Sequence, residues 1–209
     1  MMLLRRVVNV PVGFALAALL AVAPAAAQPR SHAKQKLPQA PHALPSVKPH
    51  GKNLDFLFEA LKAAPDEDSA RAVEARIWAI WMRTPSDTAA LLMSRVHIAL
   101  EKGEPDVALK LLDAIVKLRP DYVEAWNKRA TLYYMKNDYN RAMEDIEEVL
   151  RREPRHFGAL AGLGVILEET GDDRHALEAL RRALAINPHL DKVPDMVKTL
   201  SEKVEGRDI

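Results

Sequence analysis

The chain has 209 residues, of which 48% are hydrophobic, and a formal net charge of +1. It contains no cysteine, which excludes disulfide bonds, a thiol nucleophile and a thiolate metal site. Residues 28–54 carry five basic residues and no acid, whereas the chain from Asp55 onward carries 23 basic and 29 acidic residues. An acidic folded part argues against a nucleic-acid partner, because nucleic-acid-binding surfaces are basic.

Residues 1–27 are typical of a secretory signal peptide. Arg5 and Arg6 precede an apolar run over residues 7–23, and alanines at 25–27 supply an A-x-A cleavage pattern. The run is shorter than the ~20 apolar residues that span a bilayer. We expect cleavage after Ala27 and delivery to the bacterial periplasm. Retention as an inner-membrane anchor is the alternative.

Residues 28–52 are predicted to form a disordered, Pro-rich basic linker. Five prolines and few large apolar residues leave nothing to pack into a core. His32, His42 and His50 are spaced too irregularly for a chelating site, so no metal is expected there. The linker is interpreted as a solvated spacer, with weak contact to an envelope surface through its positive charge as the alternative.

Residues 53–88 are predicted to form a degenerate helical pair. Apolar residues recur at helical spacing in both halves, and Pro65 separates them. The apolar positions are Leu54, Leu57, Phe58 and Leu61, then Val73, Ile77, Ile80 and Trp81. We interpret the pair as the N-terminal cap of the array that follows, because the end units of a solenoid have no neighbour on one side.

Three stretches then match one another at a period of 34 residues: 89–122, 123–156 and 157–190. Each is predicted to be a helix, a tight turn and a second helix. Gly103, Asn137 and Gly171 supply the left-handed residue that closes each first helix. All three units have a small residue at the twentieth place, which is Ala108, Ala142 or Ala176. All three also have a proline near the end, which is Pro120, Pro154 or Pro188. Residues 191–209 are predicted to form a C-terminal capping helix that starts near Pro194.

This 34-residue unit resembles the tetratricopeptide repeat, and the chain is similar in this respect to exported bacterial proteins of that family. The resemblance implies an all-α fold, a right-handed solenoid of antiparallel helix pairs. It also implies a protein-binding scaffold whose first helices line a concave groove. Arg129, at the seventh place of its repeat, is expected to form an intra-repeat salt bridge with Asp145 on the partner helix, and a ligand-facing arginine is the alternative.

No residue pattern predicts an enzyme. The sequence lacks a phosphate-binding glycine loop, an H-E-x-x-H motif and a G-x-S-x-G turn. Its histidines are scattered among the repeats, and its acidic pairs fit solvated helix faces. We therefore expect no catalytic residue, no cofactor and no metal.

The resemblance implies a groove for a protein or peptide partner, lined by Met93, His97, Asn127, Lys128, Thr131, Tyr134, Val165 and Glu168. Family members that bind chaperone tails hold a terminal carboxylate with a clamp of lysines, asparagines and an arginine. The clamp places here hold Met93, His97, Lys128, Gly158 and Gly162. Only Lys128 is basic, so chaperone-tail binding is not expected.

The predicted function is a non-catalytic scaffold or adaptor of the bacterial cell envelope. One alternative is a self-associating structural protein, a homodimer paired through apolar end faces near Trp78 and Trp81. The other is an accessory subunit of an envelope biogenesis or export machine, which rests on family and compartment alone.

Overall fold

The computed structural model describes residues 51–206, with side chains from Asn53 onward. The predicted signal peptide and all of the linker before Gly51 lie outside these residues. The chain divides into units of residues 1–46 and 47–209, and the fold below is that of the second unit.

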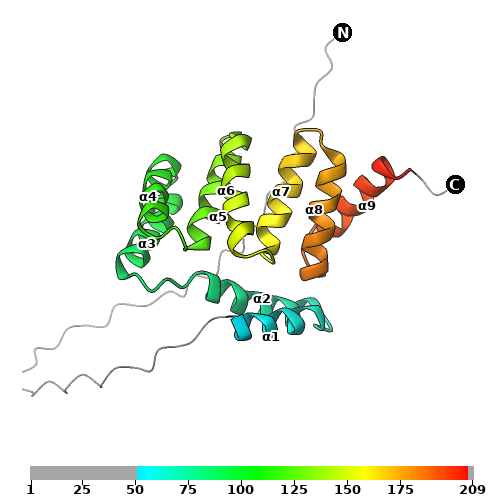
Figure 1. Cartoon of the computed structure of the whole chain (residues 1–209), viewed down its shortest axis with the longest axis horizontal. Helices are drawn as coiled ribbons and strands as arrows, with labels where there is room; N and C mark the ends of the chain where they lie inside the picture. Colours follow the sequence, from blue (N-terminus) through cyan, green and yellow to red (C-terminus); the bar gives the residue numbers. More distant parts are fainter. Residues whose placement is uncertain (1–50, 207–209) are drawn as a thin grey trace, which may run out of the picture. The chain divides into compact units, whose positions relative to one another are not determined.

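The described residues form nine helices and no strand, which confirms the predicted all-α class. Their bounds are α1 (Gly51–Lys62), α2 (Glu67–Trp81), α3 (Asp87–Glu101), α4 (Pro105–Leu118), α5 (Val123–Met135), α6 (Tyr139–Arg152), α7 (Phe157–Glu169), α8 (Asp173–Ile186) and α9 (Val193–Val204). Figure 1 shows α3 to α8 as three successive antiparallel pairs. Within the described part of the chain, no helix is both long and apolar enough to cross a bilayer.

The turn inside each pair follows from one residue with positive φ. Gly103, Asn137 and Gly171 have φ values of 70°, 58° and 86°. The following backbone N–H then returns to a carbonyl of the last helical turn, as when Asp172 N donates to Leu167 O at 2.8 Å. The carboxylate of Asp172 accepts from His175 N and so caps α8 at once. Two antiparallel helices therefore follow each other with almost no loop.

Small residues set the distance between the helices of a pair. Ala108, Ala142 and Ala176 are fully buried where the second helix crosses the first. In the third repeat the crossing is closest, because an ideal Cβ on Gly164 would lie 2.5 Å from Cγ of Leu180. The sequence places a glycine there because any side chain would push the two helices apart.

The helical pair α1–α2 packs against the third repeat. Its apolar core of Leu57, Leu61, Ile77 and Trp81 includes Phe157 at the start of α7 and is flanked by Ile186 and Leu190. Polar contacts support the same arrangement: Asn187 Nδ2 donates to Glu74 Oε2 at 3.1 Å. Figure 1 shows α1 and α2 running across one end of the repeat helices. A cap interpretation would instead place this pair against the first repeat. The rings of Trp78 and Trp81 pack against Phe157 at the start of α7.

The last helix, α9, covers α8. Leu177 and Leu180 of α8 share a buried cluster with Val193 and Leu200 of α9. An ion pair between Lys203 Nζ and Asp173 Oδ2, at 2.5 Å, ties the end of α9 to the start of α8. The apolar face of the third repeat is therefore covered.

Candidate functional site

The candidate groove is formed by the first helices α3, α5 and α7. The structure brings several predicted residues together across these helices. The pKa of the His97 imidazole on α3 is lowered by partial desolvation and, to a smaller extent, by the charge of Lys128 on α5. Tyr134 Oη donates to Glu169 Oε1 at 2.7 Å, which links α5 to α7 beside Glu168. The three helices thus present one connected strip of side chains.

Six of the eight predicted groove residues reach solvent. His97 is exposed, and the remaining five are half-buried: Lys128, Thr131, Tyr134, Val165 and Glu168. The hydroxyl of Thr131 donates to the carbonyl oxygen of Asn127 at 3.0 Å, so it still offers a lone pair to a ligand. Half-buried side chains on rigid helices can contact a partner without losing much conformational freedom. Their role in partner binding remains a prediction.

The other two predicted groove residues are buried, which corrects the sequence interpretation. Met93 is only 3% exposed, because its apolar side chain packs with Val96 and Leu112 in the core of the first repeat. Asn127 is 8% exposed, and its amide donates to Glu124 Oε2 at 3.3 Å. Both side chains are therefore largely inaccessible to solvent.

A buried polar cluster at one end of the groove was not predicted. His156 Nδ1 accepts from the backbone N–H of Ala159 at 3.0 Å and so caps α7. This leaves the proton on Nε2, which donates to Glu124 Oε1 at 2.8 Å. No residue spacing indicates this cluster, because the ring that stacks on His156 belongs to Trp81 of α2, far away in the sequence.

Helix α2 covers this end of the groove. An ideal Cβ on Gly158 would lie 3.0 Å from Cη2 of Trp78, so the indole ring lies directly against the backbone of α7. Trp78 also contacts His156 edge to face, with ring centroids 5.3 Å apart. The accessible groove is therefore shorter than the full length of the first helices. Trp81 is 6% exposed, whereas Trp78 is half-buried, and the alternative in which apolar end faces near these residues pair two copies stays a prediction.

The predicted salt bridge of Arg129 is confirmed. Its Nε and Nη2 donate to the two carboxylate oxygens of Asp145 at 2.8 and 2.7 Å. Its Nη1 also donates to Asp113 of the preceding repeat at 2.7 Å. The bidentate hydrogen bonds to Asp145 raise the pKa of this guanidinium further above its usual value. Arg129 therefore joins two repeats and is not available to a ligand.

Electrostatics along the groove change from one end to the other. The side chain of His97 is exposed in part, and its partial desolvation, together with the charge of Lys128, lowers the pKa of the imidazole below its ordinary value, so it is largely neutral near pH 7. Burial and the nearby carboxylate of Asp173 raise the pKa of Glu168. The α3–α5 part thus carries Lys128 together with Glu101, whose charge also acts on His97, whereas the α7 part carries Glu168 and Glu169.

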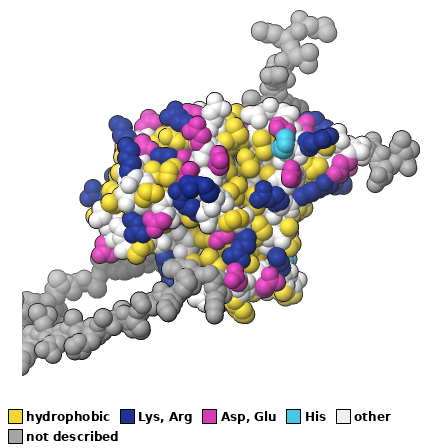
Figure 2. Space-filling model, in the orientation of Figure 1, with side chains coloured by type: hydrophobic (Ala, Val, Ile, Leu, Met, Phe, Trp, Pro, Cys, Tyr) yellow, Lys and Arg dark blue, Asp and Glu magenta, His cyan; other side chains and the backbone are white. Residues whose placement is uncertain are grey.

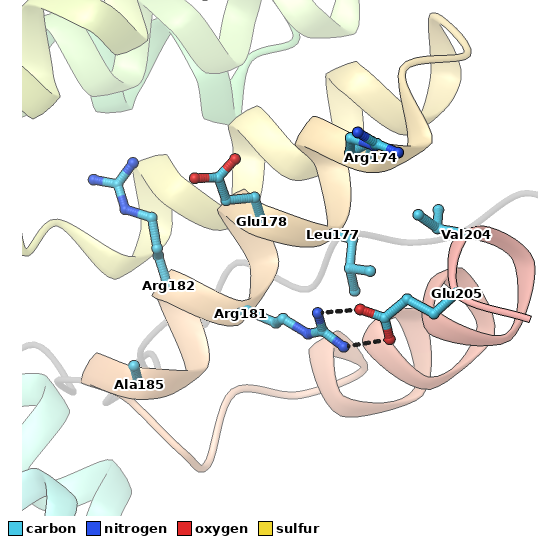
Figure 3. A pocket seen from close by; sticks show the side chains of 8 residues that line it. All are labelled: Arg174, Leu177, Glu178, Arg181, Arg182, Ala185, Val204 and Glu205. Carbon is cyan, nitrogen blue, oxygen red and sulfur yellow. Dashed lines mark hydrogen bonds and ion pairs between the residues drawn. The ribbon is translucent and has the colours of Figure 1, made fainter. Parts of the chain in front are cut away.

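Other places in the described part of the chain offer little chemistry. No group of three histidine or acidic side chains there is placed to hold a metal ion. An open pocket lies between α8 and α9, with Arg174, Arg181 and Arg182 on its rim (Figure 3). The guanidinium of Arg181 is already paired with both oxygens of Glu205, at 2.6 and 2.8 Å. Figure 2 shows basic side chains interspersed with acidic ones over the visible face.

Comparison with known proteins identifies the class of this fold. A tetratricopeptide repeat profile matches residues 93–148 and 129–191. A TPR repeat-containing protein of Rhizobium etli is 41% identical over 155 residues, which cover 74% of this chain and 76% of the relative. The chain therefore belongs to the tetratricopeptide repeat family, whose members generally mediate protein–protein interaction and are typically non-catalytic scaffolds.

More distantly related proteins match parts of this chain. The photosystem I assembly protein Ycf3 of Prochlorococcus marinus is 32% identical over 108 residues, which cover 47% of this chain and 60% of that protein. Among solved structures, the first TPR of Spaghetti (RPAP3) bound to an HSP90 peptide matches with a TM-score of 0.55 at 16% identity, over 58% of this chain and 97% of that one. MamA matches with a TM-score of 0.54 at 18% identity, over 72% and 86%. At this identity the structural likenesses show the fold alone.

Proposed function

We propose that this chain is a non-catalytic scaffold of the bacterial cell envelope that holds an extended segment of a partner protein in its concave groove. The carrying observation is the connected strip on α3, α5 and α7, in which Lys128, Thr131 and Tyr134 are half-buried on rigid helices. Half-buried polar groups beside an aromatic ring suit recognition of a peptide backbone and its side chains.

The charge along the groove limits the partner. A complementary segment would place an acidic residue near Lys128 and a basic or bulky residue near Glu168. A peptide that binds through its C-terminal carboxylate, as chaperone tails do, is not favoured as the ligand. Gly158 and Gly162 carry no side-chain donor, and Trp78 covers Gly158. The peptide named in the Spaghetti structure is therefore a precedent for the mode of binding and not for the ligand.

The envelope part of the proposal rests on residues 1–27, whose basic start, apolar run and A-x-A pattern are those of an exported chain. Fractionation of cells that express the full chain with a C-terminal tag tests it. Release of a tagged product with the periplasmic fraction, shortened by the mass of residues 1–27, supports export. Recovery of an uncut product with the cytoplasm contradicts it.

Site-specific crosslinking tests the groove. A photoreactive phenylalanine analogue is placed at Thr131 on the groove side of α5, and in a matched variant at Glu147, which is exposed on α6. We expect Thr131 to crosslink a discrete partner band in cells, and the Lys128→Ala background to weaken that band. Crosslinks from Glu147 alone, or equal crosslinks from both, would exclude the groove as the binding site.

A further inference from the structure

One end of the repeat array is apolar and exposed. The third and tenth places of the second repeat, Ala125 and Leu132, are no more than 3% exposed, because α4 of the first repeat covers them. The same places of the first repeat hold Leu91 and Ile98, which are 57% and 47% exposed. Leu91 and Ile98 are seven residues apart on α3, so they lie on one face of that helix.

Helix α4 extends this face. Val107 and Leu118 are exposed, and they are eleven residues apart, which returns them to one side of the helix. The same places of the second repeat hold Arg141 and Arg152. Leu111 lies between Val107 and Leu118 on that side. Its counterpart in the second repeat is Asp145, which contacts Arg129.

Arg129 shows which side of a repeat faces the preceding repeat. Its guanidinium binds Asp145 of its own repeat and Asp113 of the preceding repeat, so the seventh place faces the preceding unit. The seventh place of the first repeat is Arg95. We define the α3–α4 end face as Leu91, Arg95, Ile98, Val107 and Leu118. Among the described residues, no preceding repeat covers it, because α1 and α2 pack against the start of α7 and the end of α8.

The second repeat shows which kind of helix packs on the equivalent face. In the second repeat the covering helix is α4, whose Leu112 and Val116 share a buried cluster with Ala125 and Leu132. Asp113, next to Leu112, accepts from Arg129. The covering helix is thus amphipathic and carries one carboxylate beside its apolar stripe. Within the described part of the chain, Arg95 has the position of Arg129 but no recorded acidic partner.

We propose that the α3–α4 end face is a second docking surface, which takes an amphipathic helix of a partner protein with a carboxylate directed at Arg95. Two other occupants fit the charge less well. The segment of residues 28–54 carries five basic residues and no acid, so it is repelled by Arg95. A second copy related by a two-fold axis between Leu91 and Ile98 would place two Arg95 side chains beside the axis.

The test uses the helix that the chain already places on the equivalent surface. A fluorescent peptide of residues 104–119 is held helical by a lactam between the exposed side chains of Asp106 and Lys110, four residues apart. The full chain is titrated into this peptide and the anisotropy is followed. We expect the unchanged chain to bind the peptide saturably. The affinity of Leu91→Glu should be at least about tenfold weaker, because a charged side chain placed in an apolar contact must lose its hydration.

A charge exchange tests the contact with Arg95. Arg95→Glu is expected to weaken binding of the unmodified peptide. It should restore binding of a peptide that carries Asp113→Lys. The groove variant Lys128→Ala serves as control and should bind the peptide like the unchanged protein, which separates this proposal from the groove proposal. Circular dichroism of each variant confirms that the array is folded.

Three results would overturn the proposal. The first is no saturable binding by the unchanged chain, and the second is equal binding by Leu91→Glu. The third is a concentration-dependent dimer in sedimentation velocity that Leu91→Glu abolishes, since this would assign the face to a second copy of the chain.

Discussion

The indole ring of Trp81 stacks on the imidazole of His156, with ring centroids 4.1 Å apart and ring planes inclined by 12°. The two residues come from α2 and from the start of α7, so this contact fixes the helical pair α1–α2 on the third repeat. Phe157 packs beside the same indole at 5.3 Å. The contact also covers one end of the groove, and thereby sets how much of it a partner can reach.

Trp81→Ala is expected to lower the free energy of unfolding by about 3–5 kcal/mol, because a buried aromatic ring is removed and a cavity remains. Urea denaturation followed by circular dichroism measures this change. Phe56→Ala is the matched control, since Phe56 lies on α1 but is 68% exposed, and it should shift stability by no more than about 0.5 kcal/mol. Equal small shifts for both variants would mean that α1–α2 is not docked on α7.

Glu124→Ala is expected to destabilise the chain by about 1–3 kcal/mol. The substitution leaves the Nε2–H of His156 without an acceptor in a site where both side chains are buried. Glu124→Gln keeps a carbonyl oxygen at the same position, so it should cost less than Glu124→Ala. Thermal unfolding of the two variants side by side measures the difference. A larger loss for Gln than for Ala would contradict the assigned hydrogen bond.

The repeat core was predictable because its signal is local and periodic. Gly164 and Ala176 stand twelve residues apart at fixed places of the unit, and the structure brings them together at the helix crossing. Arg129 and Asp145 were predictable for the same reason. The burial of Met93 was missed because a family position predicts which helix face a residue occupies and not how deeply it is packed.

The docking of α2 was not predictable from the sequence. Trp81 and His156 are 75 positions apart and belong to no common period. The apolar spacing of α2 predicts an amphipathic helix but does not specify its partner. The exposure of Leu91 was not predictable either, because it depends on which repeat α1–α2 packs against.

Gly164→Ala is expected to destabilise the chain by about 1–3 kcal/mol through overpacking, since the added Cβ would lie 2.5 Å from Cγ of Leu180. Gly162→Ala on the same helix is the control. Its Cβ would lie 3.8 Å from Cδ1 of Ile146, an ordinary contact, and the lost flexibility of the unfolded chain should raise stability by about 0.5–1 kcal/mol. Opposite shifts of the thermal midpoint are expected, and shifts of the same sign would exclude this helix crossing.

The imidazole of His97 reports on the groove. Partial desolvation of this solvent-reaching side chain, with a smaller contribution from Lys128, lowers its pKa below the ordinary 6.5. Lys128→Ala is expected to raise this pKa only in part, because burial remains, and an NMR titration of the His97 ring signals measures it.

The same pKa shift predicts how stability depends on pH. The native state binds fewer protons at His97 than the unfolded chain wherever the pH lies between the lowered pKa and 6.5. Stability is therefore lost at this site as the pH falls through that window, and it is unaffected above it. In His97→Gln this contribution to the pH dependence should disappear. An unchanged slope of unfolding free energy against pH would show that His97 is not desolvated, and that α3 and α5 do not approach each other across the groove as described.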